Sequence, residues 1–225
     1  MSAGDPQAVL SSTPGNAKPI FRTVSKLIPL DGMDAYNLSA QRRYPNGYCS
    51  LAYSTYLMLS RLGKTLLTAT LALYFLIVAF NNMIDHETNL KFVEHILSMD
   101  SIPADANVLW RAIRSPQVHY VAYWTIILWE LTTGCICGLG AKRLFFALRS
   151  EQEFEVAKTT PIAGLWLGLL LWSLVFITIG GEWFLMWESS QWNGELAALR
   201  MFVLNAITLL FLYLPETTAT QWSAK

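Results

Sequence analysis

Charged residues are scarce in this chain. Asp, Glu, Lys and Arg make up 14% of its 225 residues, whereas an average soluble domain carries about 25%. Hydrophobic residues make up 53%, and the mean hydropathy is +0.35. So little charge leaves much of the surface to be solvated by lipid instead of water. The composition therefore predicts an integral membrane protein.

An excess of charge of either sign is also absent. The sequence holds 16 Lys and Arg against 16 Asp and Glu, so its formal net charge is zero. Nucleic-acid binding depends on an excess of cations that displaces the counterions of the phosphates. The charge balance therefore excludes nucleic acid as a partner.

Cysteines and catalytic motifs are few. An odd number of cysteines without a CxxC pair, at Cys49, Cys135 and Cys137, predicts neither a disulfide framework nor a zinc site. The histidines lack HxxxH or HxxE spacing, so we expect no metal site: His86, His95 and His119. The sequence contains no GxSxG, HExxH, P-loop or GxGxxG motif. We therefore predict a protein that is not an enzyme and has no catalytic residue.

Long hydrophobic runs are abundant. The run from Val118 to Leu139 has 22 residues and one ionisable side chain, Glu130. At about 1.5 Å per residue, such a helix crosses a hydrocarbon core of about 30 Å. Three more runs follow the same pattern, which predicts spans at about 62–80, 118–139, 161–179 and 196–214. The expected fold is all-α, a four-helix transmembrane bundle with short amphipathic helices in the first outer loop.

A polar arm precedes the membrane domain. Residues 1–49 are rich in Pro, Gly and Ser, residues 50–216 hold the spans, and residues 217–225 form a short tail. The arm cannot bury enough apolar surface to order itself, and its composition faintly resembles a mitochondrial transit peptide. We expect it to be retained and to bind neighbouring subunits.

Lys and Arg are distributed unevenly around the predicted spans. Twelve lie in the N-terminal region, the 142–160 connector and the C-terminal tail, and four lie on the opposite side. Because cytoplasmic and matrix segments retain positive charge, we expect both termini on that side of an inner membrane, either bacterial or mitochondrial. The histidines and the tryptophan-rich segment after the third span then lie on or near the outer face.

Glu130 is the most informative polar residue, because a carboxylate inside the membrane is costly and usually faces a partner, water or the protein interior. His119, Tyr123 and Glu130 are spaced i, i+4 and i+11, which places them on one helix face. This face, with Glu182 turned inward beside it, is either a proton or ligand path or a hydrogen-bonded packing site. A b-type haem would need axial histidines inside the bilayer, and only His119 lies close. We predict no cofactor except bound lipid, with haem or quinone as an alternative.

Two GxxxG motifs lie on the second and third spans, at Gly134 and Gly138 and at Gly164 and Gly168. Small residues at this spacing let helix backbones approach closely. The motifs predict either a dimer face or packing of these two helices against each other.

The predicted outer loops contain several large apolar side chains. Burying apolar surface is favourable by about 25 cal/mol per Å², so we expect these side chains to be covered. FVEHILSM predicts an amphipathic helix, and Ser101 with Pro103 predicts a second short helix as far as Ile113. The glycine pair at 180–181 predicts a break where the third span ends. We expect the 92–99 helix to contact the 182–192 segment, as an outer-surface cap built from Phe92, His95, Ile96, Met99, Trp183 and Trp187.

Several of these segments together resemble a known family: FVEHILSMD at 92–100, WRAI at 110–113, GGEWF at 180–184 and WNG at 192–194. The chain is similar to the bacterial "predicted small integral membrane protein" family, domain of unknown function 2165, over roughly residues 64–216. That resemblance implies a four-span fold and supplies no activity. The N-terminal arm is an addition to the family pattern and suggests a specialised context such as a large assembly.

The preferred hypothesis is a non-catalytic accessory or assembly subunit of an energy-transducing, respiratory-type inner-membrane complex. Its partners would be other membrane protein subunits and phospholipid. The alternatives are a small transporter or sensor that uses the face of Glu130, and a membrane anchor that binds haem or quinone.

Overall fold

The computed structural model describes residues 48–216. The predicted arm, except for its last two residues, and the predicted tail at 217–225 lie outside the described residues. The chain divides into two units at residues 1–52 and 53–225, and every contact described below lies within the second.

Regular structure in the described residues is entirely helical. The elements are α3 (Tyr48–Ile84), α4 (His86–Ser98), η1 (Leu109–Arg111), α5 (Pro116–Phe146), α6 (Glu151–Ala157), α7 (Thr159–Leu170), η2 (Leu171–Trp183), η3 (Met186–Glu188) and α8 (Glu195–Tyr213). Four stretches are long and apolar enough to cross a membrane: Ser54–Ile84, Pro116–Phe146, Glu151–Trp183 and Glu195–Tyr213. The predicted four-helix transmembrane fold is therefore confirmed.

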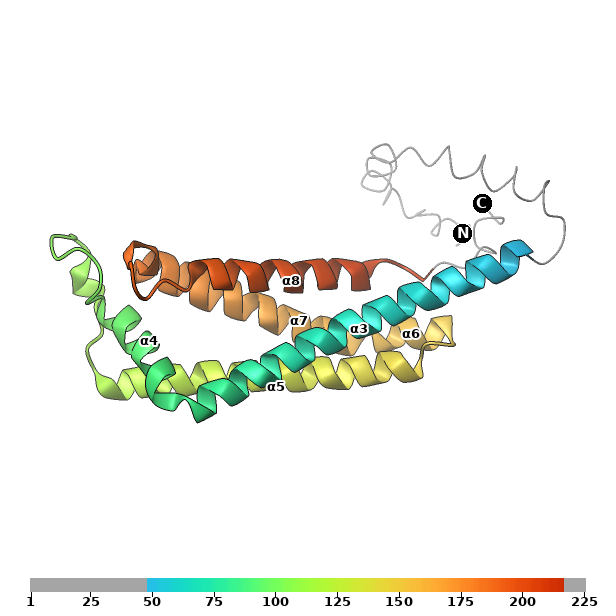
Figure 1. The fold of residues 1–225 in the computed structure, drawn as a ribbon, viewed down its shortest axis with the longest axis horizontal. Coiled ribbons are helices and arrows are strands. Elements are labelled where there is room, and N and C mark those ends of the chain that lie inside the picture. Colours follow the sequence, from blue (N-terminus) through green and yellow to red (C-terminus); the bar gives the residue numbers. More distant parts are fainter. Residues whose placement is uncertain (1–47, 217–225) are drawn as a thin grey trace, which may run out of the picture. The chain divides into compact units, whose positions relative to one another are not determined.

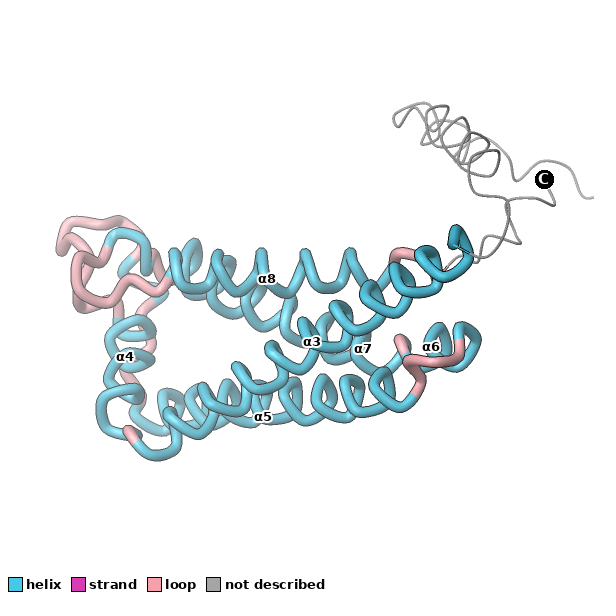
Figure 2. Tube along the Cα trace, turned by 45° about the vertical axis from the view of Figure 1, so that its right-hand side comes forward, coloured by secondary structure: helices cyan, strands magenta, loops and turns pink. Residues whose placement is uncertain are grey.

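Consecutive spans run in opposite directions (Figure 1). Helices α5 and α7 form the most extensive pair, and α8 packs against α7 and η2. One end of the bundle carries α4, which packs on α5, and is called the α4 end here. The other end carries α6 and the residues that follow α8, and is called the Glu216 end. Figure 2 shows α4 and the loop segments gathered at the α4 end.

The bundle interior is apolar, and so is much of its outside. Phe75 of α3, Cys137 of α5, Leu165 of α7 and Met201 of α8 belong to one buried cluster. Each span also exposes large aliphatic side chains on its outer face, among them Leu73, Leu128, Leu170 and Leu210. A helix that is apolar all round is typical of a membrane span, because lipid solvates the outward face.

The third span begins earlier and ends later than its sequence predicts, at Glu151 and Trp183 instead of 161 and 179. The charged connector at 149–160 is mostly helix α6, whose first turn is capped by the Ser150 hydroxyl, which accepts a hydrogen bond from the Glu153 amide at 3.3 Å. The predicted break at 180–181 is wrong, since the helix continues to Trp183. Both glycines are buried there, and packing outweighs the helix propensity lost at a glycine, about 1 kcal/mol.

The loop between the first and second spans also differs in part from its prediction. The amphipathic helix forms as α4, but the expected second helix is reduced to the single turn of η1. The residues from 99 to 108 form turns instead, starting at Met99, whose φ of 52° is left-handed. A helix so short lacks the length to be stable by propensity alone, so the path of this loop is set by its contacts with the rest of the α4 end.

The GxxxG glycines lie at helix contacts inside the bundle. A Cβ added at Gly134 would meet Leu76 of α3 at 2.9 Å, and one at Gly164 would meet the Sγ of Cys137 on α5 at 2.6 Å. The expected packing of the second and third spans against each other is confirmed, since α5 and α7 form the most extensive pair, but only one of the two motifs contributes to that contact. Gly164 faces the second span, but Gly134 faces the first.

The second glycine of each motif differs in how closely it is packed. A Cβ at Gly168 would meet Asn205 Oδ1 of α8 at 2.5 Å, whereas one at Gly138 would meet only Ala72 at 3.8 Å. A distance of 3.8 Å is ordinary van der Waals contact. Gly138 therefore has room for a methyl group and Gly168 does not.

We expect Gly164→Ala to lower the free energy of unfolding by about 1–3 kcal/mol, because the added methyl group overpacks the α5–α7 contact. The backbone nitrogen of Cys137, 3.1 Å from the added Cβ, cannot move aside cheaply. Gly138→Ala is the matched control and should leave stability unchanged or raise it. Unfolding in mixed detergent micelles, followed by circular dichroism, measures both. Equal losses in the two variants would contradict this packing.

Candidate functional site

A hydrogen-bonded group of polar side chains lies between α3 and α5. Glu130 is 1% exposed, and its Oε2 accepts a hydrogen bond from Asn82 Nδ2 at 2.8 Å. The backbone carbonyl of the same Asn82 accepts a hydrogen bond from the Tyr123 hydroxyl. Asn82 thus bridges Tyr123 and Glu130, and fixes the end of α3 to the middle of α5. Asn82 lies just beyond the predicted first span at 62–80, and no local sequence pattern connects it with Glu130.

His119 lies on the same buried face of α5 but does not join this group. Its Nε2 donates to the carbonyl oxygen of Ile113 at 2.7 Å, and so holds the loop that precedes α5. His86 approaches the group instead, with its ring centroid 5.1 Å from that of Tyr123.

Glu182 is not part of the group. It is exposed near the end of η2, so the expectation that it turns inward is wrong. The cause is the continued helix: because the third span does not break at 180–181, Glu182 stays on an outward position of that helix.

The predicted contact between the 92–99 helix and the 182–192 segment is present at the α4 end. Ile96 and Met99 share one buried apolar cluster with Phe184 and Met186. The ring of Trp192 stacks on a histidine of α4, His95, with centroids 4.5 Å apart. Ser101 Oγ donates to Ser189 Oγ at 2.9 Å and adds a polar link.

The residues that the 182–192 segment contributes are not the predicted ones. Trp183 and Trp187 are exposed, whereas Phe184, Met186 and Trp192 pack inward. The helix ends at Trp183 and not at residue 179 as predicted, so the chain turns at Leu185, whose φ is 53°. Because the turn lies at Leu185 and not at the glycine pair, Phe184 and Met186 face α4 in place of Trp183 and Trp187.

An unexpected cluster of buried charges lies at the Glu216 end. Three cations surround the Glu216 carboxylate, and all four side chains are buried: Arg61, Lys64, Lys158 and Glu216. Arg61 Nε lies 3.2 Å from Glu216 Oε2, Lys158 Nζ lies 3.2 Å from Oε1, and Lys64 Nζ donates to the same Oε1. The cluster joins α3, the start of the third span and the chain after α8.

Backbone carbonyls and two further carboxylates complete the cluster. The carbonyl oxygen of Leu214 accepts from Lys64 at 2.9 Å and from Lys158 at 2.8 Å. Glu155 Oε1 accepts from Lys158 at 3.0 Å, and Glu151 lies 4.0 Å from Arg61. Three carboxylates therefore face three cations, so the cluster is balanced in charge.

Comparison with known proteins places the chain in a family. The model of a family described as "predicted small integral membrane protein (DUF2165)" matches residues 60–215. The chain belongs to this family. No curated protein and no solved structure matched it significantly. The matched region contains the Asn82 group, the α4 end and the three cations, and it ends one residue before Glu216.

Family membership assigns no chemistry, so any activity must be inferred from the groups themselves. Within residues 48–216, no three His, Cys, Asp or Glu side chains gather as they would around a metal ion. Within each of the two polar groups, the side chains instead bind one another across helices. Each group is an internal clamp on α3, one at Asn82 and the other at Arg61 and Lys64.

The charge of Glu216 depends on its cationic neighbours. Burial alone would raise the pKa of Glu216, but the hydrogen bond and charge of Lys64, together with those of Lys158, outweigh burial and hold the pKa below its ordinary value of 4.5. The unfolded chain therefore binds a proton at a higher pH than the folded one. The stabilisation due to Glu216 is complete above about pH 4.5 and is lost as the pH falls through the lower pKa of the folded state.

We expect Glu216→Gln to lower the free energy of unfolding at pH 7 by about 3–5 kcal/mol, because it leaves buried cations without a counter-charge. The difference from the wild type should shrink as the pH falls from about 4.5 through the lower pKa of the folded state, where the wild-type carboxyl is itself protonated. Denaturant titrations in detergent at several pH values measure both effects.

Glu151→Gln is the matched control. Its carboxylate is 4.0 Å from Arg61 and partly exposed, so its loss should cost about 0–1 kcal/mol. An equal loss in both variants, or a difference that does not change with pH, would rule out the clamp at Glu216.

Proposed function

We propose that the protein is a non-catalytic accessory or assembly subunit of an energy-transducing, respiratory-type inner-membrane complex. The observation that carries this proposal is an exposed aromatic surface at the α4 end. We call it the tryptophan surface, and it consists of the exposed Trp110 and Trp183 with the half-buried Arg111, whose guanidinium lies over both rings.

The tryptophan surface is held in place by its own contacts. The rings of Trp110 and Trp183 meet edge to face, with centroids 6.1 Å apart. The guanidinium carbon of Arg111 lies 4.6 Å from the Trp183 ring centroid, and Arg111 Nη1 donates to the Trp183 carbonyl at 3.4 Å. Trp and Arg are the residue types most enriched at the energetic centres of protein interfaces. A surface already ordered in this way loses little entropy when a partner binds.

The polar residues inside the bundle support a structural role over transport. Asn82 is hydrogen-bonded to Glu130 and Tyr123, and Glu216 is hydrogen-bonded to Arg61 and Lys64. A transport path needs polar groups that are open to a substrate, whereas these bind one another. What the molecule offers to its surroundings is therefore its outer surface.

Two further parts of the proposal concern its surroundings. Phospholipid and other membrane subunits are the proposed partners, since all four spans expose apolar side chains. The Glu216 end is proposed to lie on the cytoplasmic or matrix side, because Lys142, Arg143 and Arg149 are found there with Arg61 and Lys64.

The functional proposal predicts that the tagged full-length protein, extracted from its own membrane in mild detergent, migrates with a defined energy-transducing complex. Native electrophoresis with mass spectrometry of the bands would identify the other subunits and their stoichiometry. Trp183→Ala should release the protein from the complex at detergent concentrations that the wild type withstands.

Trp166→Ala is the control for this experiment, because Trp166 is as exposed as Trp183, at 48% against 47%, but lies on α7 outside the tryptophan surface. It should leave the complex intact. A wild-type protein that runs as a monodisperse free monomer would refute the accessory-subunit function.

The proposed orientation predicts which positions an impermeant thiol reagent reaches. In a variant without native cysteines, Trp187→Cys should be labelled in intact cells or mitoplasts, and Ser150→Cys only after the membrane is permeabilised. Trp187 is exposed at the α4 end, and Ser150 precedes α6 at the Glu216 end. Labelling of position 150 in intact samples, without labelling of position 187, would reverse the orientation.

A further inference from the structure

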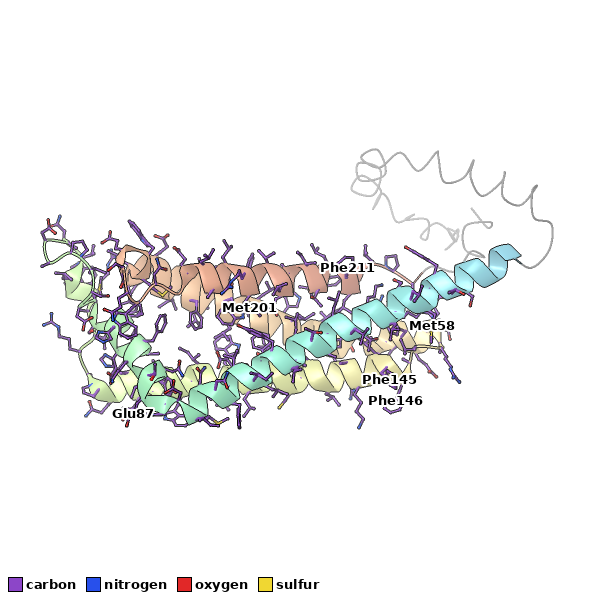
Figure 3. The ribbon with its side chains drawn as sticks, in the orientation of Figure 1. Met58, Glu87, Phe145, Phe146, Met201 and Phe211 are labelled. Atoms are coloured by element: carbon purple, nitrogen blue, oxygen red, sulfur yellow. The ribbon has the colours of Figure 1, made fainter. Side chains whose placement is uncertain are left out.

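A groove of about 750 Å³ lies at the Glu216 end, between the last turns of α5 and helix α6. Its apolar wall includes Leu139, Phe146 and Val156, and its polar rim includes Lys142, Arg143 and Glu153. Phe146 and Val156 are among the most exposed apolar side chains of the protein, at 73% and 71%. Figure 3 shows Phe145 and Phe146 at this end of α5. The described structure leaves this apolar wall uncovered.

The cations of the groove are free to bind a ligand. Lys142 is exposed and has no hydrogen-bond or ion-pair partner among residues 48–216. Arg143 donates from Nη1 to Thr160 Oγ1 at 2.6 Å, which positions the guanidinium and leaves its other N–H groups available. The nearby buried cations, by contrast, are engaged with Glu216.

We propose that this groove binds one anionic diacyl phospholipid, with the phosphodiester at Lys142 and Arg143 and an acyl chain along Leu139, Phe146 and Val156. Basic pockets between membrane helices on the cytoplasmic or matrix side are suited to anionic headgroups. The apolar wall distinguishes a lipid from a free phosphate. Only a ligand with a hydrocarbon chain can cover Phe146 and Val156 and remove them from water.

The charge balance selects the class of headgroup. Lys142 and Arg143 bring two positive charges and Glu153 brings one negative charge, so the rim carries one net positive charge. A phosphatidylglycerol-type lipid, with a single phosphodiester charge, neutralises this rim. A phosphatidylethanolamine-type lipid would instead need Glu153 as a partner for its ammonium group. The effect of removing the Glu153 charge therefore has opposite signs for the two lipids.

Native mass spectrometry of the full-length protein in detergent tests the proposal, with phosphatidylglycerol, phosphatidylethanolamine and phosphatidylcholine of matched acyl chains added separately. We expect one phosphatidylglycerol to be retained per protein in preference to the other two. Lys142→Gln should weaken this binding about fivefold, and Lys142→Glu should abolish it. Because the Lys142 side chain has no hydrogen-bond or ion-pair partner in the described structure, neither change removes a polar contact of the fold, and circular dichroism checks that the variants stay folded.

Two further variants make the result specific to the groove. Glu153→Gln should strengthen phosphatidylglycerol binding, because it removes a like charge from the rim. Lys91→Gln changes an exposed lysine of α4, at the other end of the bundle, and should have no effect.

Four results would overturn the proposal. They are preferential retention of phosphatidylethanolamine that Glu153→Gln weakens, equal retention of all three lipids, an equal effect of Lys91→Gln, and a polypeptide that occupies the groove in place of lipid. The test does not depend on the accessory-subunit function, since it uses the isolated protein.

Discussion

The bundle depends on one carboxylate beyond its last span. Glu216 lies among Arg61, Lys64 and Lys158, and each of the four side chains is buried. Cations removed from water need a counter-charge, because the cost of desolvating an unpaired charge is several kcal/mol. Their salt bridges join the first span to the third and to the chain after the fourth. The position of the helix ends at the Glu216 end therefore follows from this charge balance.

The α4 end is held by different physics. Apolar burial of Ile96, Met99, Phe184 and Met186 joins the two loops of the α4 end, with the stacked rings of His95 and Trp192 at its edge. Below this cap, Asn82 links α3 to α5 through hydrogen bonds. Helix α3 is thus fixed by polar contacts near both ends, and its middle packs closely because Gly134 leaves room for Leu76. A helix held in this way is suited to presenting constant outer surfaces.

These surfaces are what the molecule has available for function. Its interior polar groups bind one another, while the tryptophan surface and the groove between α5 and α6 face outward with their side chains already positioned. The two surfaces lie at opposite ends of the bundle and differ in chemistry. One is aromatic and suits a protein partner, whereas the other combines cations with an apolar wall and suits lipid.

The sequence by itself determined the four spans, their order and the amphipathic helix, because lipid solvation and the spacing of apolar residues act locally along the chain. It also placed His119, Tyr123 and Glu130 on one face, since helix geometry alone decides that. Only the tertiary structure decided the partners. Arg61 meets Glu216 across 155 residues and Asn82 meets Glu130 across 48, and no local pattern encodes such pairs. Tertiary packing also kept the helix intact through Gly180 and Gly181, which turned Phe184 inward and Trp183 outward against local propensity.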